Sequence, residues 1–194
     1  FFNVIMKNWT FKKWNTVLGW VVFVIAFFTY LSTIEPNFSF WDCGEYISSA
    51  VKLEVTHAPG AALFQLVGAV AAIFGFGDPS KYSIIINAMS ALFSAFTILF
   101  LFWTITHLVR RLLNKDFEEV SFTEEIAILF SGVIGALSFT FSDTFWFSAV
   151  EGEVYAMASM FIALLVWLIT KWENEYHEKD NERWLILIFF MTGL

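Results

Sequence analysis

The sequence predicts an all-α membrane protein in which several helices cross the bilayer. Hydrophobic residues make up 58% of the chain and the mean hydropathy is +0.68, which is more apolar character than a soluble domain of 194 residues can bury. Uncharged apolar runs recur along the chain at lengths that suit transmembrane helices. Lysine and arginine gather in a few connecting segments, as they do on the cytoplasmic side of membrane proteins. These three observations indicate a polytopic transmembrane helix bundle.

The first predicted span covers residues 16–34. This run carries no charged residue and is long enough to cross a hydrocarbon core of about 30 Å. Lys7, Lys12 and Lys13 precede it and place its beginning on the cytoplasmic side. The segment that follows therefore lies on the outer side.

Two short helices are predicted in this first outer loop. Residues 42–54 have an amphipathic pattern, which favours a helix lying on the membrane surface. Residues 58–77 carry no charge and are long enough for a span, but a crossing here would put the basic residues near Arg110 outside. The same segment is rich in glycine and alanine, which suits packing onto other helices. We expect it to be juxtamembrane or re-entrant.

Four further spans are expected at 82–106, 126–142, 154–170 and 184–194, the last of them incomplete. In this topology nine of the eleven Lys and Arg residues are cytoplasmic, with only Lys52 and Lys81 outside. The chain opens on Phe1 and ends inside an apolar run. We therefore interpret residues 1–194 as the amino-terminal part of a single transmembrane domain in a longer polypeptide.

A polar stripe is predicted on the span at 82–106. Its members recur at helical spacing and are Asn87, Ser90, Ser94 and Thr97. Polar groups facing lipid would be unsatisfied, so the stripe should point into the bundle. It either lines a cavity or, as we expect, serves helix packing and hydrogen bonding.

Asp42 and Glu45 are the leading candidates for chemistry. At positions i and i+3 they share one face of a helix, where a carboxylate pair can do acid and base work. The alternative is a capping box in which these side chains and Ser39 only satisfy the N–H groups of a helix start. Glu151 and Glu153 reach the same outer side, and closely spaced carboxylates raise the pKa of one another toward that of a general base.

Several classes of site are disfavoured. A net charge of −7 with eleven basic residues argues against nucleic acid as a partner. Cys43 is the single cysteine, so neither an internal disulfide nor a cysteine zinc site forms within the chain. A divalent cation held by Asp42, Glu45 and Glu151 or Glu153 stays open, but no spacing demands a metal, and no cofactor is assigned.

Short blocks of residues, in order along the chain, carry a family resemblance. They are Thr33-Ile34-Glu35-Pro36, Phe40-Trp41-Asp42-Cys43-Gly44-Glu45, Lys52-Leu53-Glu54-Val55, His57-Ala58-Pro59-Gly60, Asn87-Ala88-Met89-Ser90-Ala91 and Trp146-Phe147-Ser148-Ala149-Val150-Glu151-Gly152-Glu153-Val154-Tyr155. Together they resemble the amino-terminal region of a family of membrane protein O-mannosyltransferase-like proteins, which is similar to the GT-C class of glycosyltransferases. The resemblance covers Val17 to Leu194, and His57-Ala58-Pro59 resembles the family's His-Pro-Pro with its middle position changed.

The resemblance implies a bundle of GT-C type and assigns roles to outer residues. Asp42 matches the catalytic base and Glu45 its companion acid. His57 or Lys52 is a candidate contact for the phosphate of the donor, although His57 also suits a plain polar position before a Pro-Gly turn. The remaining candidates for substrate binding are Trp41, Glu151, Glu153 and Tyr155.

The implied activity is transfer of a hexose, mannose by resemblance, from a polyprenyl-phosphate-linked donor to a protein Ser or Thr hydroxyl. The expected partners are the lipid-linked donor, the protein acceptor and membrane lipid. We expect an integral, multi-pass protein of a bacterial inner membrane with its active site on the non-cytoplasmic side. The alternative is a non-catalytic scaffold or lipid-carrier-binding subunit that retains the bundle.

Overall fold

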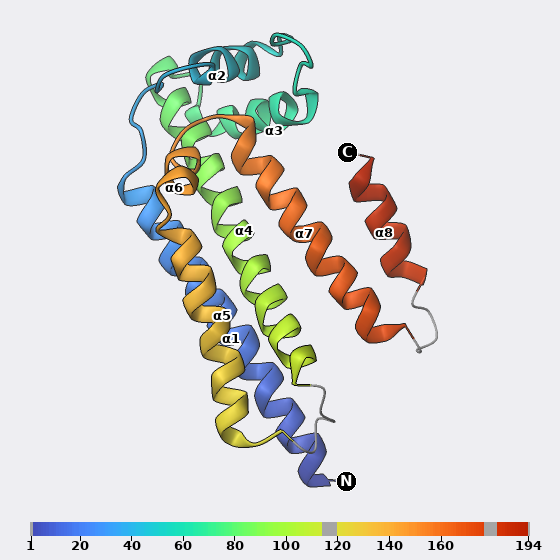
Figure 1. The fold of residues 1–194 in the computed structure, drawn as a ribbon. Helices are drawn as coiled ribbons and strands as arrows, with labels where there is room; N and C mark the ends of the chain where they lie inside the picture. Colours follow the sequence, from blue (N-terminus) through green and yellow to red (C-terminus); the bar gives the residue numbers. More distant parts are fainter. Residues whose placement is uncertain (1, 114–119, 177–181, 194) are drawn as a thin grey trace.

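The computed structural model describes residues 2–113, 120–176 and 182–193, with side chains from Phe11 onward, and this part of the chain forms helices and no strand (Figure 1). The elements are α1 Phe2–Ser32, α2 Cys43–Lys52, α3 Ala62–Ala72, η1 Ile73–Gly75, η2 Pro79–Lys81, α4 Tyr82–Leu112, α5 Phe122–Thr140, α6 Asp143–Ala149, α7 Val154–Glu175 and α8 Glu182–Thr192. Among the described residues, four segments are long and apolar enough to cross a membrane: Phe11–Ser32, Pro79–Leu112, Phe122–Thr140 and Val154–Glu175. The predicted all-helical membrane bundle is confirmed.

Helix α4 is the central element of the bundle. It packs against α1, α5 and α7, while α8 lies along the outer side of α7 (Figure 1). The close approach of α5 to α4 depends on glycine, because a Cβ atom at Gly132 would lie 2.5 Å from Thr106 Cγ2 and 2.8 Å from Phe102 Cε2. On the other side, the hydroxyl of Tyr30 in α1 donates a 3.0 Å hydrogen bond to the carbonyl oxygen of Thr140 at the end of α5.

The short helices α2, α3 and α6 gather at one end of the bundle, opposite the amino terminus (Figure 1). Helix α3 has 11 residues, about 16 Å at 1.5 Å per residue, and does not cross a core of about 30 Å. It packs on α2 and α4. The assignment of 58–77 as a juxtamembrane or re-entrant segment stays a prediction.

The helix ends differ from the predicted span ends. Helix α4 continues to Leu112 and so includes Arg110 and Arg111, whose long side chains reach the polar end of the bundle. Helix α5 begins at Phe122 because Ser121 and Glu124 form a capping box in which each side chain bonds the other's backbone N–H. The predicted connector after residue 142 contains the extra helix α6. Part of the segment between the spans predicted at 82–106 and 126–142, residues 114–119, lies outside the described residues.

The polar stripe of α4 points into the protein, as predicted. Its members are almost fully buried, with exposed fractions of 0% for Asn87, Ser90 and Ser94 and 4% for Thr97. The expected helix-to-helix hydrogen bonds are not seen within the described residues, where the hydroxyls of Ser90 and Ser94 have no partner. Thr97 bonds its own helix, and Asn87 bonds the first outer loop.

Candidate functional site

Two loops meet at the end of the bundle that carries α2, α3 and α6 (Figure 1). The first joins α1 to α2, and the second, residues 150–153, joins α6 to α7. The indole N–H of Trp146 donates a 2.8 Å hydrogen bond to Thr33 Oγ1, and the backbone N–H of Glu35 donates a 3.2 Å bond to the carbonyl oxygen of Val150. These bonds join segments more than 110 residues apart in sequence into one surface.

The side chain of Asn87, on α4, forms hydrogen bonds with the backbone of the first loop. Its side-chain amide donates two 2.7 Å hydrogen bonds, one to the carbonyl oxygen of Glu35 and one to that of Asn37. The second loop packs over the same side chain at Gly152, where a Cβ atom would lie 2.9 Å from Asn87 Oδ1 and 3.1 Å from Ile47 Cγ1. Only glycine fits here without displacing its neighbours, so Asn87 is the point at which α4, both loops and α2 come together.

Asp42, Glu45 and His57 form a cluster at the start of α2. Glu45 accepts a 2.7 Å hydrogen bond from the backbone N–H of His57, and its other oxygen lies 3.0 Å from His57 Nδ1. His57 Nε2 faces Asp42 Oδ2 at 3.9 Å. Both imidazole nitrogens therefore point toward carboxylates.

The capping-box alternative for this stretch is wrong. Asp42 occupies the position before α2, but its side chain makes no capping hydrogen bond, and Glu45 bonds His57 instead. The third member of the expected box, Ser39, donates its hydroxyl to the carboxylate of Glu151. The Asp42 carboxylate therefore lies at the surface, open to solvent, with one oxygen facing His57.

Charge pairing within the cluster shifts two pKa values in opposite directions. The backbone and side-chain N–H groups of His57 lower the pKa of Glu45. The hydrogen bond to Glu45 and the charges of Glu45 and Asp42 raise the pKa of His57. Both shifts favour the charged forms, an imidazolium next to a carboxylate.

The same cluster has a geometry that suits a divalent cation. One ligand atom from each of Asp42, Glu45 and His57 lies within 4.8 Å of the others. The set differs from the one expected from sequence, because His57 takes the place of Glu151 or Glu153. Carboxylate oxygens with one imidazole nitrogen are common ligands of divalent metals.

Glu151 and Glu153 lie beneath the cluster and are buried, with exposed fractions of 3% and 5%. Burial, followed by the charges of Glu151 and Asp42, raises the pKa of Glu153 from 4.5 to about 7. Burial also raises the pKa of Glu151, and the hydrogen bond from Ser39 opposes this rise. The predicted upward shift thus falls on the two acids of the second loop.

Trp41, Tyr155 and Lys52, the other predicted site residues, are exposed at the surface, but not all of them lie beside the cluster. Trp41 is 85% exposed and has a left-handed backbone (φ 62°), and Tyr155 is 59% exposed at the start of α7. Lys52 is exposed at the far end of α2, and within the described residues no hydrogen bond or ion pair joins it to the cluster. The structure therefore brings Asp42, Glu45 and His57 together but does not bring Lys52 to them.

Sequence reasoning missed three residues that build the site. Ser39 holds Glu151, and Asn87 holds the first loop. Tyr46 packs its ring against His57, with centroids 5.8 Å apart. A buried asparagine at the outer end of a span was the available signal, because an amide there needs partners outside its own helix. Ser39 was expected only as a member of a capping box, and no local pattern predicts its contact with Glu151 or the contact of Tyr46 with His57.

Comparison with known proteins adds independent findings. Residues 42–194 match the family model described as "Protein O-mannosyl-transferase TMEM260 N-terminal domain". The chain is 29% identical over 167 residues to a Dictyostelium discoideum protein named "Protein O-mannosyl-transferase tmem260", covering 84% of this chain and 18% of the relative. It is 28% identical over 172 residues to the Mus musculus protein "Protein O-mannosyl-transferase TMEM260", covering 88% of this chain and 21% of the relative.

The chain thus spans about a fifth of the length of these curated relatives. Both relatives are eukaryotic, so the comparisons give no support to the expected bacterial inner membrane. No solved structure matches the chain. The family model covers most of the chain, including the acidic cluster, α4 and the second loop. The chain therefore belongs to the family of the protein O-mannosyl-transferase TMEM260 N-terminal domain.

Proposed function

We propose that this chain is the amino-terminal, active-site-bearing part of a glycosyltransferase of GT-C type. It transfers mannose from a polyprenyl-phosphate-linked donor to a Ser or Thr hydroxyl of a protein on the non-cytoplasmic side. The observation that carries the proposal is the Asp42, Glu45 and His57 cluster, set over the buried Glu153 in a member of this family. The names of the two relatives support the same activity.

Asp42 is the proposed general base. Its carboxylate is exposed and has no capping hydrogen bond, so an acceptor hydroxyl can approach within the roughly 3 Å that proton transfer requires. Removing the proton makes the hydroxyl oxygen a better nucleophile for the anomeric carbon of the donor. Trp41, exposed beside Asp42, and Tyr155, exposed at the start of α7, offer aromatic faces for the substrates.

His57 and Glu45 act on the leaving group. Glu45 binds His57 through one contact with its backbone N–H and one with its ring, and it raises the pKa of the ring, which favours the charged form near the base. An imidazolium N–H stabilises the negative charge that develops on the departing lipid phosphate. Lys52, at the other end of α2, is a second cation for the donor phosphate only if the bound donor spans the helix.

Glu151 and Glu153 are the buried acids beneath the cluster. With its pKa raised to about 7, Glu153 holds a proton in a large fraction of molecules at neutral pH. It therefore carries less negative charge next to Asp42 and the incoming phosphate than an ordinary glutamate would. We propose that these two acids contact the substrates and limit the repulsion between donor and site.

The side of the membrane follows from the charges. In the structure the acidic cluster lies at the opposite end of the bundle from the beginning of α1 and the ends of α4 and α7, which carry Lys12, Lys13, Arg110, Arg111 and Lys171 (Figure 1). Basic segments tend to remain cytoplasmic, which supports our proposal that the cluster lies on the outer side.

The test is transfer of labelled mannose from a polyprenyl-phosphate donor to a Ser/Thr peptide by the full-length protein. Asp42→Asn keeps the shape of the side chain but cannot accept a proton near neutral pH, and loss of a positioned base lowers rates by about 10²- to 10⁴-fold. We expect such a loss with wild-type expression and melting temperature, and a smaller loss for Glu45→Gln. The matched control is Glu54→Gln, an exposed acid of the same loop outside the cluster.

The result that contradicts the proposed base is full activity of Asp42→Asn. The base would then be Glu153 or another acid of the second loop. An absence of transfer by the wild-type protein with several lipid-linked sugars would instead favour a non-catalytic, lipid-carrier-binding role. Repeating the wild-type assay after chelation shows whether the three-ligand cluster works with a divalent cation.

A further inference from the structure

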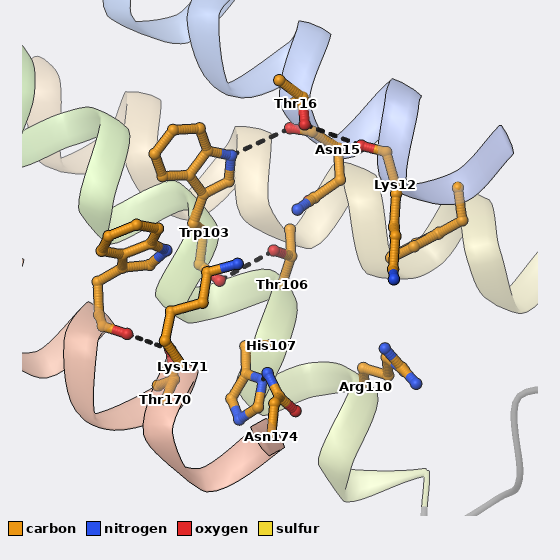
Figure 2. Close-up of a pocket in the computed structure, with 12 residues that line it drawn as sticks. Lys12, Asn15, Thr16, Trp103, Thr106, His107, Arg110, Thr170, Lys171 and Asn174 are labelled. Atoms are coloured by element: carbon orange, nitrogen blue, oxygen red, sulfur yellow. Dashed lines mark hydrogen bonds between the residues drawn. The ribbon is translucent and has the colours of Figure 1, made fainter. Parts of the chain in front are cut away.

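A second concave site lies at the end of the bundle opposite the acidic cluster. It is a cavity of about 450 Å³ between α1, the last turns of α4 and the last turns of α7 (Figure 2). This volume falls within the range of small-molecule sites in proteins. The function proposed above makes no use of this cavity.

The lining of the cavity is cationic. Lys12 of α1, Arg110 of α4 and Lys171 of α7 all contribute to it, and its twelve lining residues include no Asp or Glu. In Figure 2 the side chain of Lys171 extends toward Trp103 and Thr106, and that of Lys12 enters the same space from α1. Two ammonium groups facing one cavity repel each other unless an anion lies between them.

The nearby carboxylates form hydrogen bonds with other groups, and Glu175 also attracts Lys171 from beyond salt-bridge distance. Glu173 binds Arg111 and lies 3.0 Å from His107 Nε2. Glu175 accepts hydrogen bonds of 2.7 Å from Arg183 and 2.6 Å from Trp184. Within the described ranges, no carboxylate lies at salt-bridge distance from Lys12 or Lys171.

The cavity is also lined by two tryptophan rings and by a buried side-chain oxygen that accepts no hydrogen bond within the described structure. The rings of Trp103 and Trp167 lie 5.5 Å apart, and Lys171 Nζ lies 5.2 Å from the centre of the Trp167 ring. The indole N–H of Trp103 donates a 3.2 Å hydrogen bond to the backbone oxygen of Asn15. The side-chain oxygen of Asn15 is buried and has no hydrogen-bond partner within the described structure, so it can accept from a hydroxyl of a ligand.

We propose that this cavity binds the phosphate group of a phosphate ester, with Lys12 and Lys171 as its cationic contacts and Arg110 beside them. Ammonium groups are established binders of phosphate oxygens, and basic pockets between transmembrane helices receive anionic lipid headgroups. The tryptophan wall suits the apolar or ring-shaped remainder of such an ester. The ester belongs either to a membrane lipid or to a soluble molecule, and the shared chemistry is the phosphate.

The experiment uses the full-length protein in nanodiscs of neutral phosphatidylcholine. Short-chain phosphatidic acid, extra short-chain phosphatidylcholine, glycerol phosphate and inorganic phosphate are added separately, and affinity is measured by native mass spectrometry and thermal shift. The test variants are Lys12→Gln and Lys171→Gln, singly and together. The control is Lys81→Gln, which removes an exposed lysine paired with Asp78 at the other end of the bundle.

We expect binding of phosphatidic acid but not of added phosphatidylcholine. Each Gln variant should weaken it about fivefold, and the double variant about thirtyfold. Lys81→Gln and the charge-preserving Lys12→Arg/Lys171→Arg pair should bind like wild type. Without phosphate, the double Gln variant should melt close to the wild-type temperature, because loss of the repulsion between the two lysines offsets loss of the contact between Lys171 and the Trp167 ring, and this shows that it is folded.

Response to the lipid alone identifies a headgroup, and response also to glycerol phosphate or inorganic phosphate identifies a soluble ester. Either result supports the phosphate site. Equal affinities of the wild-type protein and the folded double Gln variant would overturn it. So would an equal response to phosphatidic acid and phosphatidylcholine, or no response of the full-length protein to any phosphate probe.

Discussion

Replacing Asn87 tests whether one buried side chain on α4 positions the whole acidic site. In the structure its amide group donates two hydrogen bonds of 2.7 Å to the loop that leads into Asp42. Each such bond contributes about 0.5 to 1.5 kcal/mol, so Asn87→Leu should lower the free energy of unfolding by about 1 to 3 kcal/mol. The same change should lower mannose transfer, because the backbone of residues 35–37 loses its anchor.

The matched control is Ser90→Ala on the next turn of the same helix face. Ser90 is as fully buried as Asn87, but its hydroxyl has no hydrogen-bond partner within the described structure. Removing it should therefore leave stability unchanged or raise it slightly. A further variant, Asn87→Asp, keeps the shape and turns the donor into an acceptor facing two carbonyl oxygens, so it should be at least as destabilising as Asn87→Leu.

The measurement is thermal unfolding of the purified full-length protein in detergent, together with transfer activity. If Asn87→Leu melts like wild type while Ser90→Ala is destabilised, burial alone explains the stripe and the anchoring role is wrong. If Asn87→Leu is destabilised but fully active, Asn87 stabilises the bundle without positioning the site.

Three further results are expected. Burial raises the pKa of Glu153 from 4.5 to about 7, so the folded state holds the proton of Glu153 more tightly than the unfolded chain does. As the pH rises from about 4.5 to about 7, the free energy of unfolding of the wild type should therefore fall by about 1 to 3 kcal/mol relative to that of Glu153→Gln. The same pH dependence of stability in both proteins would contradict this. Cysteines placed at Phe38 and Arg183 should react with impermeant reagents on the outer and cytoplasmic sides respectively, and labelling of Arg183 from outside would refute the orientation. Gly152→Ala should cost about 1 to 3 kcal/mol because its Cβ meets the amide oxygen of Asn87 at 2.9 Å, and unchanged melting would show that the loop can move aside.

The bundle could be predicted because a bilayer imposes length and composition on every helix that crosses it. The long apolar segments could therefore be recognised in the sequence. The tendency of basic residues to lie on the cytoplasmic side suggested that residues 58–77 do not cross the membrane. Helix ends were less predictable: α4 carries its charged residues to Leu112, where the hydropathy signal has already stopped. Helix α6 is too short to show a period.

The sequence predicted which site residues lie at the same end of the bundle, but it did not predict which of their side chains are in contact. Counting spans placed Asp42, Glu45, Glu151 and Glu153 at one end. The contact of Glu45 with His57 depends on the path of the loop after α2, and the burial of Glu151 depends on Ser39 crossing from another loop. Such long-range pairings leave no periodic trace in sequence.

The bonds between the two outer loops also affect how the protein is made. Asn87 follows Glu35 by 52 residues, but Glu151 follows its partner Ser39 by 112 residues. At a synthesis rate of about 5 to 20 residues per second, the first loop leaves the ribosome about 5 to 20 s before its second partner exists. During that interval Asp42 and its neighbours are exposed on the nascent chain, because Glu151 and Glu153, which lie beneath them in the folded protein, have not yet been made. The buried acids Glu151 and Glu153 therefore join the site late, after the ribosome has delivered α6 and the following turn, and agents that bind the early loop would compete with this contact.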